Sequence, residues 1–188
     1  MRHWRYPAFA LLIVLHGCNP FRTGTPEQPG GQLINYPQPT TTDNVLRILA
    51  LSLGAKDNRA YLERLASDFA FSPDPVQRQS DNFRNFPAAW GYEHEEIFLA
   101  GLFSNADSIA VEWHNVLTQP QGEGATVTAF YDLTIWSQAQ PETHYRGRAE
   151  FSMVQVAGIW NIRTWNDVVE GEYTTTWGLL RARLLATG

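Results

Sequence analysis

The sequence predicts an α+β domain in which a curved antiparallel sheet packs on helices. Apolar residues recur at helical spacing between residues 43 and 105, with one short strand among the helices. From residue 108 the apolar period changes to two, which is typical of strands with one buried face, and helical spacing returns near residue 174. Helices that precede a series of strands favour an α+β domain over a doubly wound sheet. Such a sheet, wrapped on its helices, makes a cone with one apolar mouth.

The first helix is expected to begin at Thr42 or Asp43, because either side chain can cap a helix N-terminus. Gly54 is expected to end this helix, as glycine does after a last turn. The residues predicted to face inward recur at helical spacing: Val45, Leu46, Leu49 and Leu53.

A second, short helix is expected after Asn58, which can cap it. Its predicted apolar face consists of Tyr61, Leu62 and Leu65. Phe69 and Phe71 then lie two positions apart and indicate a short strand, which Pro73 and Pro75 end.

The third helix follows an irregular stretch at residues 76–90. Its first turns carry Glu93, Glu95 and Glu96, where acidic side chains interact favourably with the helix dipole. Its inward positions are predicted from helical spacing to be Ile97, Phe98, Gly101 and Leu102.

The remaining elements are four strands and a terminal helix. The strands are predicted from the period of two at residues 108–117, 125–136, 143–156 and 159–169. The connections between them are polar or short, as in hairpins. The terminal helix has the inward residues Leu179, Leu180 and Leu184.

The N-terminus is typical of a secretory signal peptide. Arg2 and Arg5 precede an apolar run from residue 7 to residue 15, which is too short to span a membrane. The sequence LHGC that follows resembles the lipobox of bacterial lipoproteins, which implies that Cys18 carries the lipid. The alternative is that Cys18 is a buried free thiol. Asn19 after the cysteine implies, by the same resemblance, the outer membrane facing the periplasm.

Three segments follow from this assignment. Residues 1–17 are expected to be the signal peptide. Residues 18–42 are expected to be the lipidated N-terminus and a disordered linker rich in proline, glycine and threonine. Residues 43–188 are expected to form the domain.

Composition excludes two classes of protein. The chain has a formal net charge of −5 and no run of basic residues, so it lacks the clustered cations that bind nucleic acid. Cys18 is the only cysteine, so the chain contains no internal disulfide and its stability depends on the core.

Residues 43–169 resemble the nuclear transport factor 2-like superfamily, which includes ketosteroid isomerases and scytalone dehydratase. The resemblance near the start depends on an acidic second helix and the strand that follows it, with the matching residues Asp57, Tyr61, Leu65, Asp68 and Phe69. Near the end it depends on a glycine turn before the last strand, with the matching residues Gly158, Trp160 and Ile162. The resemblance implies a cone-shaped fold. The helix that contains Trp177 has no counterpart in the enzymes.

The resemblance implies candidate catalytic residues. The isomerases use a carboxylate base with tyrosine and protonated aspartate as oxyanion donors. The tyrosine position falls near Leu49, which has no proton to donate, and the base position falls near Asp74. Because Asp74 lies between two prolines, a turn alone also explains it. Asp132 lies on a strand among polar neighbours, where it can simply face water.

A dehydratase would need a histidine with an aspartate inside the cone. His114 and His144 are the candidates, but His114 shares a strand face with Glu112, which favours a solvated side chain. One strand face carries Arg146, Arg148 and Glu150. This row can bind an anionic ligand through bidentate hydrogen bonds, or it can face solvent and form cross-strand pairs. No metal site is expected, because His94 lacks a second histidine at helical spacing.

Tryptophan is the strongest compositional signal. Six of the seven tryptophans lie in the predicted domain. Aromatic side chains can line the mouth of a cone and bind an apolar or sugar ligand. The candidate ligand-binding residues are Trp90, Trp113, Tyr131 and Trp165. The alternative is an ordinary aromatic core with a dimer interface on the outer sheet face.

The sequence therefore predicts a lipid-anchored bacterial envelope protein that acts without catalysis. Its cone-shaped domain would bind a small ligand, contact a protein partner or serve a structural role. The alternative is an isomerase or a lyase of the dehydratase kind that acts on a small apolar substrate in the cone. The expected partners are the membrane, a small apolar ligand and a second copy of the chain; no cofactor and no nucleic acid is expected.

Overall fold

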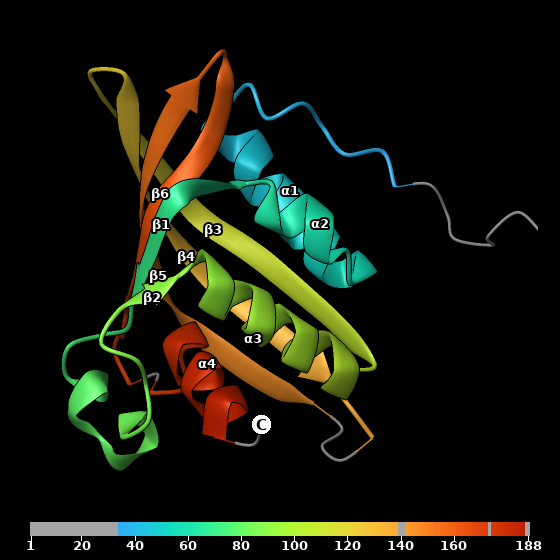
Figure 1. Cartoon of the computed structure of the whole chain (residues 1–188), viewed down its shortest axis with the longest axis vertical. Helices are drawn as coiled ribbons and strands as arrows, with labels where there is room; N and C mark the ends of the chain where they lie inside the picture. The colour runs from blue at the N-terminus through green and yellow to red at the C-terminus, as the bar shows by residue number, and fades with distance from the viewer. Residues whose placement is uncertain (1–33, 139–141, 173, 187–188) are drawn as a thin grey trace, which may run out of the picture. The chain divides into compact units, whose positions relative to one another are not determined.

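The computed structural model describes residues 34–138, 142–172 and 174–186 (Figure 1). The expected signal peptide, Cys18 and most of the expected linker lie outside these ranges. The helices are α1 (Thr42–Ala55), α2 (Asn58–Leu62), α3 (Tyr92–Asn105) and α4 (Trp177–Ala186). The strands are β1 (Leu65–Ser72), β2 (Trp90–Gly91), β3 (Ser108–Gln121), β4 (Gly124–Trp136), β5 (Thr143–Val156) and β6 (Ile159–Val168). Two short 3-10 turns, η1 (Gln77–Gln79) and η2 (Asp81–Phe83), lie between β1 and β2.

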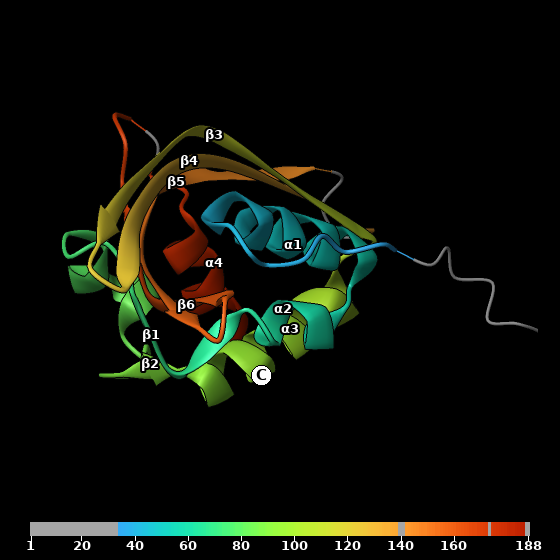
Figure 2. The same ribbon diagram turned by 90° about the horizontal axis from the view of Figure 1, so that it is seen from above.

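The six strands of the described chain form one sheet in the order β2-β1-β6-β5-β4-β3. All neighbouring pairs are antiparallel except β1 and β6, which are parallel. Figure 2 shows the sheet curving around α1 and α4, with α2 and α3 on its open side. The predicted α+β class with a curved sheet is therefore confirmed, and α4 lies within the curve.

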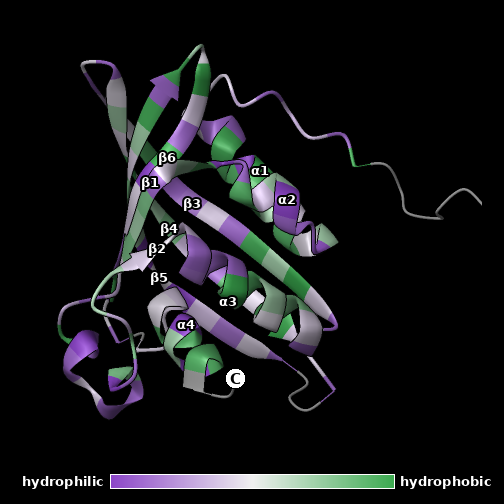
Figure 3. Cartoon of the chain, in the orientation of Figure 1, coloured by the Kyte–Doolittle hydropathy of each residue, from purple (hydrophilic) through white to green (hydrophobic). Residues whose placement is uncertain are grey.

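Alternating burial along the central strands gives the sheet its inner and outer faces. Buried and half-buried residues alternate from Gly124 to Thr134 in β4 and from Tyr145 to Val154 in β5. Figure 3 shows the same alternation as bands of hydropathy along the strands. The inner face of these two strands packs in the core with side chains such as Val127, Leu133, Phe151 and Met153. The core therefore lies between the concave sheet face and the helices.

The helix boundaries differ from the expected ones by one or two residues. Thr41, rather than Thr42 or Asp43, caps α1, because its side chain accepts a hydrogen bond from the Asn44 amide at 3.2 Å. The helix continues through Gly54 and ends at Lys56, which adopts a left-handed conformation with φ of 56°. Asp57, rather than Asn58, caps α2 and accepts from the Ala60 amide at 3.0 Å.

Helix α3 is rotated relative to the prediction. Ile97, which was expected to face inward, has 62% of its surface exposed. The buried face instead follows the spacing i, i+3, i+4, i+7 and consists of Glu95, Phe98, Leu99 and Leu102. Glu95 was expected in the first turns for its interaction with the helix dipole, and its side chain has no exposed area. A partner in another helix, described below, accounts for this rotation.

The edge strand β3 is longer than predicted and irregular. It continues four residues past the expected end at 117, through Pro120, which an edge strand tolerates because one side of its backbone needs no ladder partner. A bulge interrupts the pairing between His114 and Leu117, where Asn115 has a φ of 50°. Strand β5 has the predicted bounds, and the turn at residues 157 and 158 has positive φ at both positions, as tight hairpins require.

The chain contacts the domain before the expected boundary at residue 43. The Tyr36 hydroxyl donates to Oδ2 of Asp57 at 3.0 Å, and the Trp160 amide donates to the Pro39 carbonyl at 2.8 Å. Burial is the main cause that raises the pKa of Tyr36 to about 12, and the hydrogen bond to Asp57 is the second. The last part of the expected linker is therefore attached to the domain. None of the helices in the described ranges is long and apolar enough to cross a membrane.

Candidate functional site

The inner face of α4 fills the space enclosed by the sheet. The side chains of Trp177 and Arg181, one helical turn apart, have no exposed area. Thr176 precedes the helix, and its hydroxyl accepts weakly from the Leu179 amide at 3.4 Å. Figure 1 shows α4 beside α3, on the concave side of the sheet. The apolar interior expected of a cone is thus occupied by the chain itself.

Trp177 contacts three of the four aromatic residues that were candidate ligand-binding residues. Its ring stacks on Trp113 at a centroid distance of 5.9 Å and an interplanar angle of 19°. It meets Trp165 edge-to-face at 4.7 Å and Tyr131 at 5.4 Å. The fourth candidate, Trp90, stacks on Phe86 at 4.9 Å. Trp113, Tyr131 and Trp165 therefore pack against Trp177, whereas Trp90 packs against Phe86, and all of these candidates but Trp113 are buried.

Arg181 and Glu95 form an ion pair inside the domain. The guanidinium donates from Nη2 to Oε1 of Glu95 at 2.6 Å and from Nε to Oε2 at 3.0 Å, a bidentate arrangement. The Tyr61 hydroxyl and the Trp90 indole N–H donate to the same carboxylate at 2.9 Å and 2.7 Å. Each carboxylate oxygen of Glu95 therefore accepts two hydrogen bonds. Burial is the largest single influence on Arg181 and opposes its charge, but the attraction and hydrogen bonding to Glu95, together with attraction to Tyr61 and Asp167, outweigh it and raise the pKa of Arg181.

Asp167 binds the N-terminus of α4. Its Oδ1 accepts from the Tyr131 hydroxyl at 2.6 Å, and its Oδ2 accepts from the Gly178 amide at 2.6 Å. The Tyr131 oxygen in turn accepts from the Trp177 amide at 2.8 Å. Two of the N–H groups that a helix N-terminus leaves unpaired are thereby satisfied. Burial raises the pKa of Asp167, and the hydrogen bond from Tyr131 opposes that rise.

Sequence reasoning missed the three charged residues of the interior, Glu95, Asp167 and Arg181. For Glu95 a signal existed, because it shares the i, i+3, i+4, i+7 stripe with Phe98, Leu99 and Leu102. For Arg181 the signal was its position four residues after Trp177 in a leucine-rich helix. For Asp167 the signal was its position two residues after Trp165, which puts both side chains on the same face of the strand.

Asp74 lies in the turn after β1, where backbone groups occupy its carboxylate. Oδ1 accepts from the amides of Val76 at 2.8 Å and Gln77 at 3.2 Å. Oδ2 accepts from the Val169 amide at 3.1 Å. This is the arrangement of an aspartate that shapes a turn and ties it to a neighbouring segment.

His114 and Asp132 lie together on another part of the surface. Both line a shallow pocket of about 330 Å³, and Asp74 is not among its lining residues. The His114 side chain is 51% exposed and lies 3.7 Å from Glu112. Asp132 accepts from Nε of Arg146 at 2.7 Å. The three candidate catalytic residues are therefore not brought to a common point inside the cone.

The charged row on β5 forms cross-strand and neighbouring pairs. Arg146 pairs with Asp132 of β4, and Arg148 pairs with Glu150 and, at 2.6 Å, with Glu170. In the described ranges, no group of three or more His, Cys, Asp or Glu side chains is placed to hold a metal ion.

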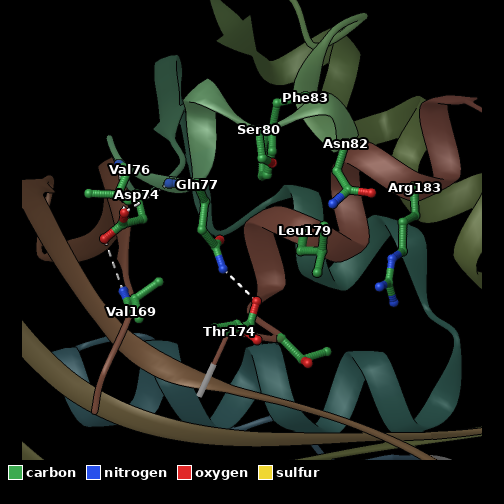
Figure 4. Close-up of a pocket in the computed structure, with 11 residues that line it drawn as sticks. Asp74, Val76, Gln77, Ser80, Asn82, Phe83, Val169, Thr174, Leu179 and Arg183 are labelled. Atoms are coloured by element: carbon green, nitrogen blue, oxygen red, sulfur yellow. Dashed lines mark hydrogen bonds between the residues drawn. The ribbon is translucent and has the colours of Figure 1, made fainter. Parts of the chain in front are cut away.

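An open pocket of about 670 Å³ lies between the η1–η2 segment, the β6–α4 connection and the outer face of α4. We call it the α4 pocket. Figure 4 shows its lining residues, with Asp74 and Arg183 on opposite sides. Its apolar lining comes from Val76, Phe83, Val169 and Leu179, and its polar lining from Asp74, Gln77, Ser80, Asn82, Thr174, Thr175 and Arg183. Asp74 is the only one of these residues that was predicted as a candidate site residue, and Leu179 was predicted as an inward residue of the terminal helix.

Gln77 joins two walls of the α4 pocket. Its amide nitrogen donates to the Thr174 carbonyl at 2.5 Å, and its amide oxygen accepts from the Thr176 hydroxyl at 2.7 Å. One side chain thus ties η1 to the segment that leads into α4. The shape of the α4 pocket depends on α4 remaining in the interior.

Comparison with solved structures identifies the class of fold. A proposed aromatic-ring hydroxylase from Novosphingobium aromaticivorans aligns at a TM-score of 0.59 and 15% identity, over 73% of this chain and 92% of that chain. A proposed scytalone dehydratase from the same organism aligns at 0.57 and 14% identity, over 72% and 90%. A proposed dehydratase of the nuclear transport factor 2-like family from Streptomyces avermitilis aligns at 0.53 and 12% identity, over 68% and 92%.

The chain therefore has the cone-shaped α+β fold of nuclear transport factor 2-like proteins, as the sequence motifs predicted. No family model and no curated protein matches its sequence. At such low identity to the solved structures, the likeness defines the fold and leaves the activity to be argued from the residues of this chain.

Proposed function

We propose that this chain is a lipid-anchored protein of the bacterial envelope whose domain is non-catalytic and binds a small ligand in the α4 pocket. The lipobox-like sequence that ends at Cys18 supports the anchor. The observation that supports a non-catalytic domain is the burial of Trp177 and Arg181 in the interior of the cone, where an enzyme of this fold class would need room for a substrate.

Both carboxylates that the described part of the chain buries beside α4 are engaged in hydrogen bonds. A general base must lie within hydrogen-bond reach of the proton that it removes. Glu95 accepts four hydrogen bonds and pairs with Arg181. Asp167 has both oxygens engaged by Tyr131 and Gly178. These two carboxylates stabilise the docked helix, and neither is among the lining residues of the α4 pocket.

The α4 pocket supports the ligand-binding part of the proposal. Its volume of about 670 Å³ lies within the usual range of small-molecule sites, about 300–1,000 Å³. Phe83 and Leu179 offer apolar contact area, while Asn82, Thr175 and Arg183 offer hydrogen-bond groups. A ligand of mixed polar and apolar character fits this lining.

A retention and turnover experiment tests both parts of the proposal. The purified full chain is incubated with a bacterial metabolite extract, and retained and consumed compounds are identified by mass spectrometry. Ser80→Trp places an indole in the α4 pocket, and Ser67→Trp introduces the same side chain at an exposed position of β1 as a control.

The proposal predicts a compound retained by the native chain and by Ser67→Trp but lost in Ser80→Trp. Equal retention by all three proteins would contradict the α4 pocket as the site, and no retained compound would contradict ligand binding. Consumption of more than one equivalent of any compound by the native chain would contradict the non-catalytic assignment and favour the isomerase or lyase alternative.

A further inference from the structure

We infer that the centre of the cone is a binding site for a guanidinium cation, which the chain fills with its own Arg181. This inference concerns the interior of the domain and does not depend on the α4 pocket or its ligand. It assigns to the interior a chemical specificity that would remain if the Arg181 side chain were removed.

Aromatic rings enclose the guanidinium group. The Cζ atom of Arg181 lies 4.0 Å from the ring centroid of Phe71, 4.5 Å from that of Trp165 and 4.9 Å from that of Phe98. The rings of Trp177 and Trp90 lie at 5.6 Å and 5.9 Å. All five distances lie within the range of about 6 Å over which a ring face attracts a cation. We call Phe71, Trp90, Phe98 and Trp165 the aromatic cage.

Glu95 supplies the counter-charge, and other elements hold it in place. The Tyr61 hydroxyl of α2 and the Trp90 indole N–H of β2 both donate to its carboxylate. These two donors do not belong to α4. The carboxylate is therefore oriented independently of Arg181, as a preorganised binding group should be.

The whole cage is likewise built outside α4. Phe71 comes from β1, Trp90 from β2, Phe98 from α3 and Trp165 from β6. The rings also support one another, since Phe71 meets Trp90 and Trp165 edge-to-face at 6.0 Å and 5.9 Å. Shortening the side chain at position 181 would leave a cavity with a carboxylate on one side and ring faces around it.

This geometry selects guanidinium over ammonium. A guanidinium group is flat, so its faces can lie against rings while its edge donates two parallel hydrogen bonds to one carboxylate. Arg181 uses this arrangement through Nε and Nη2, whereas Nη1 has no hydrogen-bond partner among the described residues. An ammonium group of the same charge can make neither the two-point contact nor the flat stack.

Occupation of this site links cation binding to the position of α4. Arg181 and Trp177 lie on the same face of α4. Release of the guanidinium from Glu95 would therefore also weaken the packing of the Trp177 indole in the interior. By linkage, a guanidinium ligand that enters the cage competes with docking of α4. The chain thus carries its own ligand on its C-terminal helix.

Chemical rescue of the full-length Arg181→Ala variant tests the inference. Methylguanidinium chloride at millimolar concentration is compared with methylammonium chloride and sodium chloride. Methylguanidinium is expected to raise the Tm of Arg181→Ala by about 3 to 6 °C at ten times its Kd, with a logarithmic dependence on concentration. The native chain should show no such rise, because its site is filled.

Two further variants separate recognition from a general salt effect. Arg163→Ala removes an exposed arginine that pairs with Asp68 at 3.0 Å, and methylguanidinium should leave its Tm unchanged. Combining Glu95→Gln with Arg181→Ala keeps the cavity and removes the carboxylate, so the rescue should disappear.

The outcomes are distinct even if Arg181→Ala does not fold alone. In that case methylguanidinium, and neither control salt, should restore its near-ultraviolet circular dichroism. Absence of any rescue, equal rescue by methylammonium, or equal rescue in the variant that also lacks Glu95 would each overturn the inference. None of these results depends on whether the α4 pocket binds a ligand.

Discussion

Arg181 and Glu95, 86 residues apart in the chain, form a bidentate ion pair in which neither side chain has any exposed area. The pair joins the C-terminal helix α4 to α3 across the interior of the cone. It fixes which face of α3 is buried and where α4 lies. The proposed non-catalytic role follows from this pair and from Trp177, one turn earlier on the same helix.

Glu95→Gln is expected to lower the free energy of unfolding by about 3–5 kcal/mol, because it leaves the buried charge of Arg181 without a counter-charge. Urea unfolding measures the change. Glu63→Gln is the matched control, since Glu63 makes an exposed ion pair with Arg59 at 2.8 Å and should cost at most about 1 kcal/mol. Equal costs for the two variants would contradict the buried pair.

Replacing both partners should cost less than replacing one. The double variant Glu95→Leu with Arg181→Met removes both charges and keeps most of the volume, so no buried charge is left unpaired. Its free energy of unfolding should exceed that of Glu95→Leu alone. A double variant less stable than the single one, in the same urea measurement, would show that the two side chains do not act as a pair.

Trp177→Ala is expected to lower the free energy of unfolding by about 3–5 kcal/mol, because it opens a cavity among Trp113, Tyr131 and Trp165. Trp160→Ala, at a half-buried position of β6, is the control and should cost less. Thermal unfolding of both variants checks the difference. A smaller loss for Trp177→Ala than for Trp160→Ala would argue that α4 does not occupy the interior.

Tyr36 should make stability depend on pH in the alkaline range. Its pKa in the folded chain is raised to about 12 from 10.0. A raised pKa stabilises the fold below the unfolded value, and this contribution is lost as the pH rises from about 10 to about 12. The difference in free energy of unfolding between the native chain and Tyr36→Phe should therefore fall over that interval. A constant difference would contradict the hydrogen bond from Tyr36 to Asp57.

Cys18→Ser is expected to leave the chain unprocessed or soluble, because serine cannot receive the lipid that the lipobox-like sequence implies. Fractionation of cells into membrane and soluble proteins measures the outcome. If the variant stays as firmly bound to the membrane as the native chain, the lipoprotein assignment fails.

The sheet was predictable because its signal is local. The period of two within residues 125–136 and 143–156 indicates the strands and their inner faces without knowledge of the rest of the chain. The observed N-caps of α1 and α2 lie one residue before the predicted ones, because neighbouring polar residues are equally able to cap a helix. Thr41 stands beside Thr42, and Asp57 beside Asn58, and only the backbone path selects between them.

The content of the interior was not predictable, because it depends on contacts between distant residues. The apolar residues of α3 fit either a face that includes Ile97 or a face that includes Glu95, and the pairing of Glu95 with Arg181 selects the second. Similarly, Trp113 and Trp165 look equally suited to a ligand or to a core until Trp177 is found in contact with both. An additional helix after the last strand has no counterpart in the motifs of the fold, so the sequence gives no indication of where it packs.

Amide hydrogen exchange of Gly178, measured by nuclear magnetic resonance on the native chain, tests most directly whether α4 fills the cone in solution. This amide donates to the buried Asp167 carboxylate at 2.6 Å, so it exchanges only when the helix leaves the interior. We expect its opening free energy to match that of core amides such as Val127 in β4. Exchange as fast as that of the exposed Gly171 amide, before α4, would show an interior that is open in solution and would contradict the account.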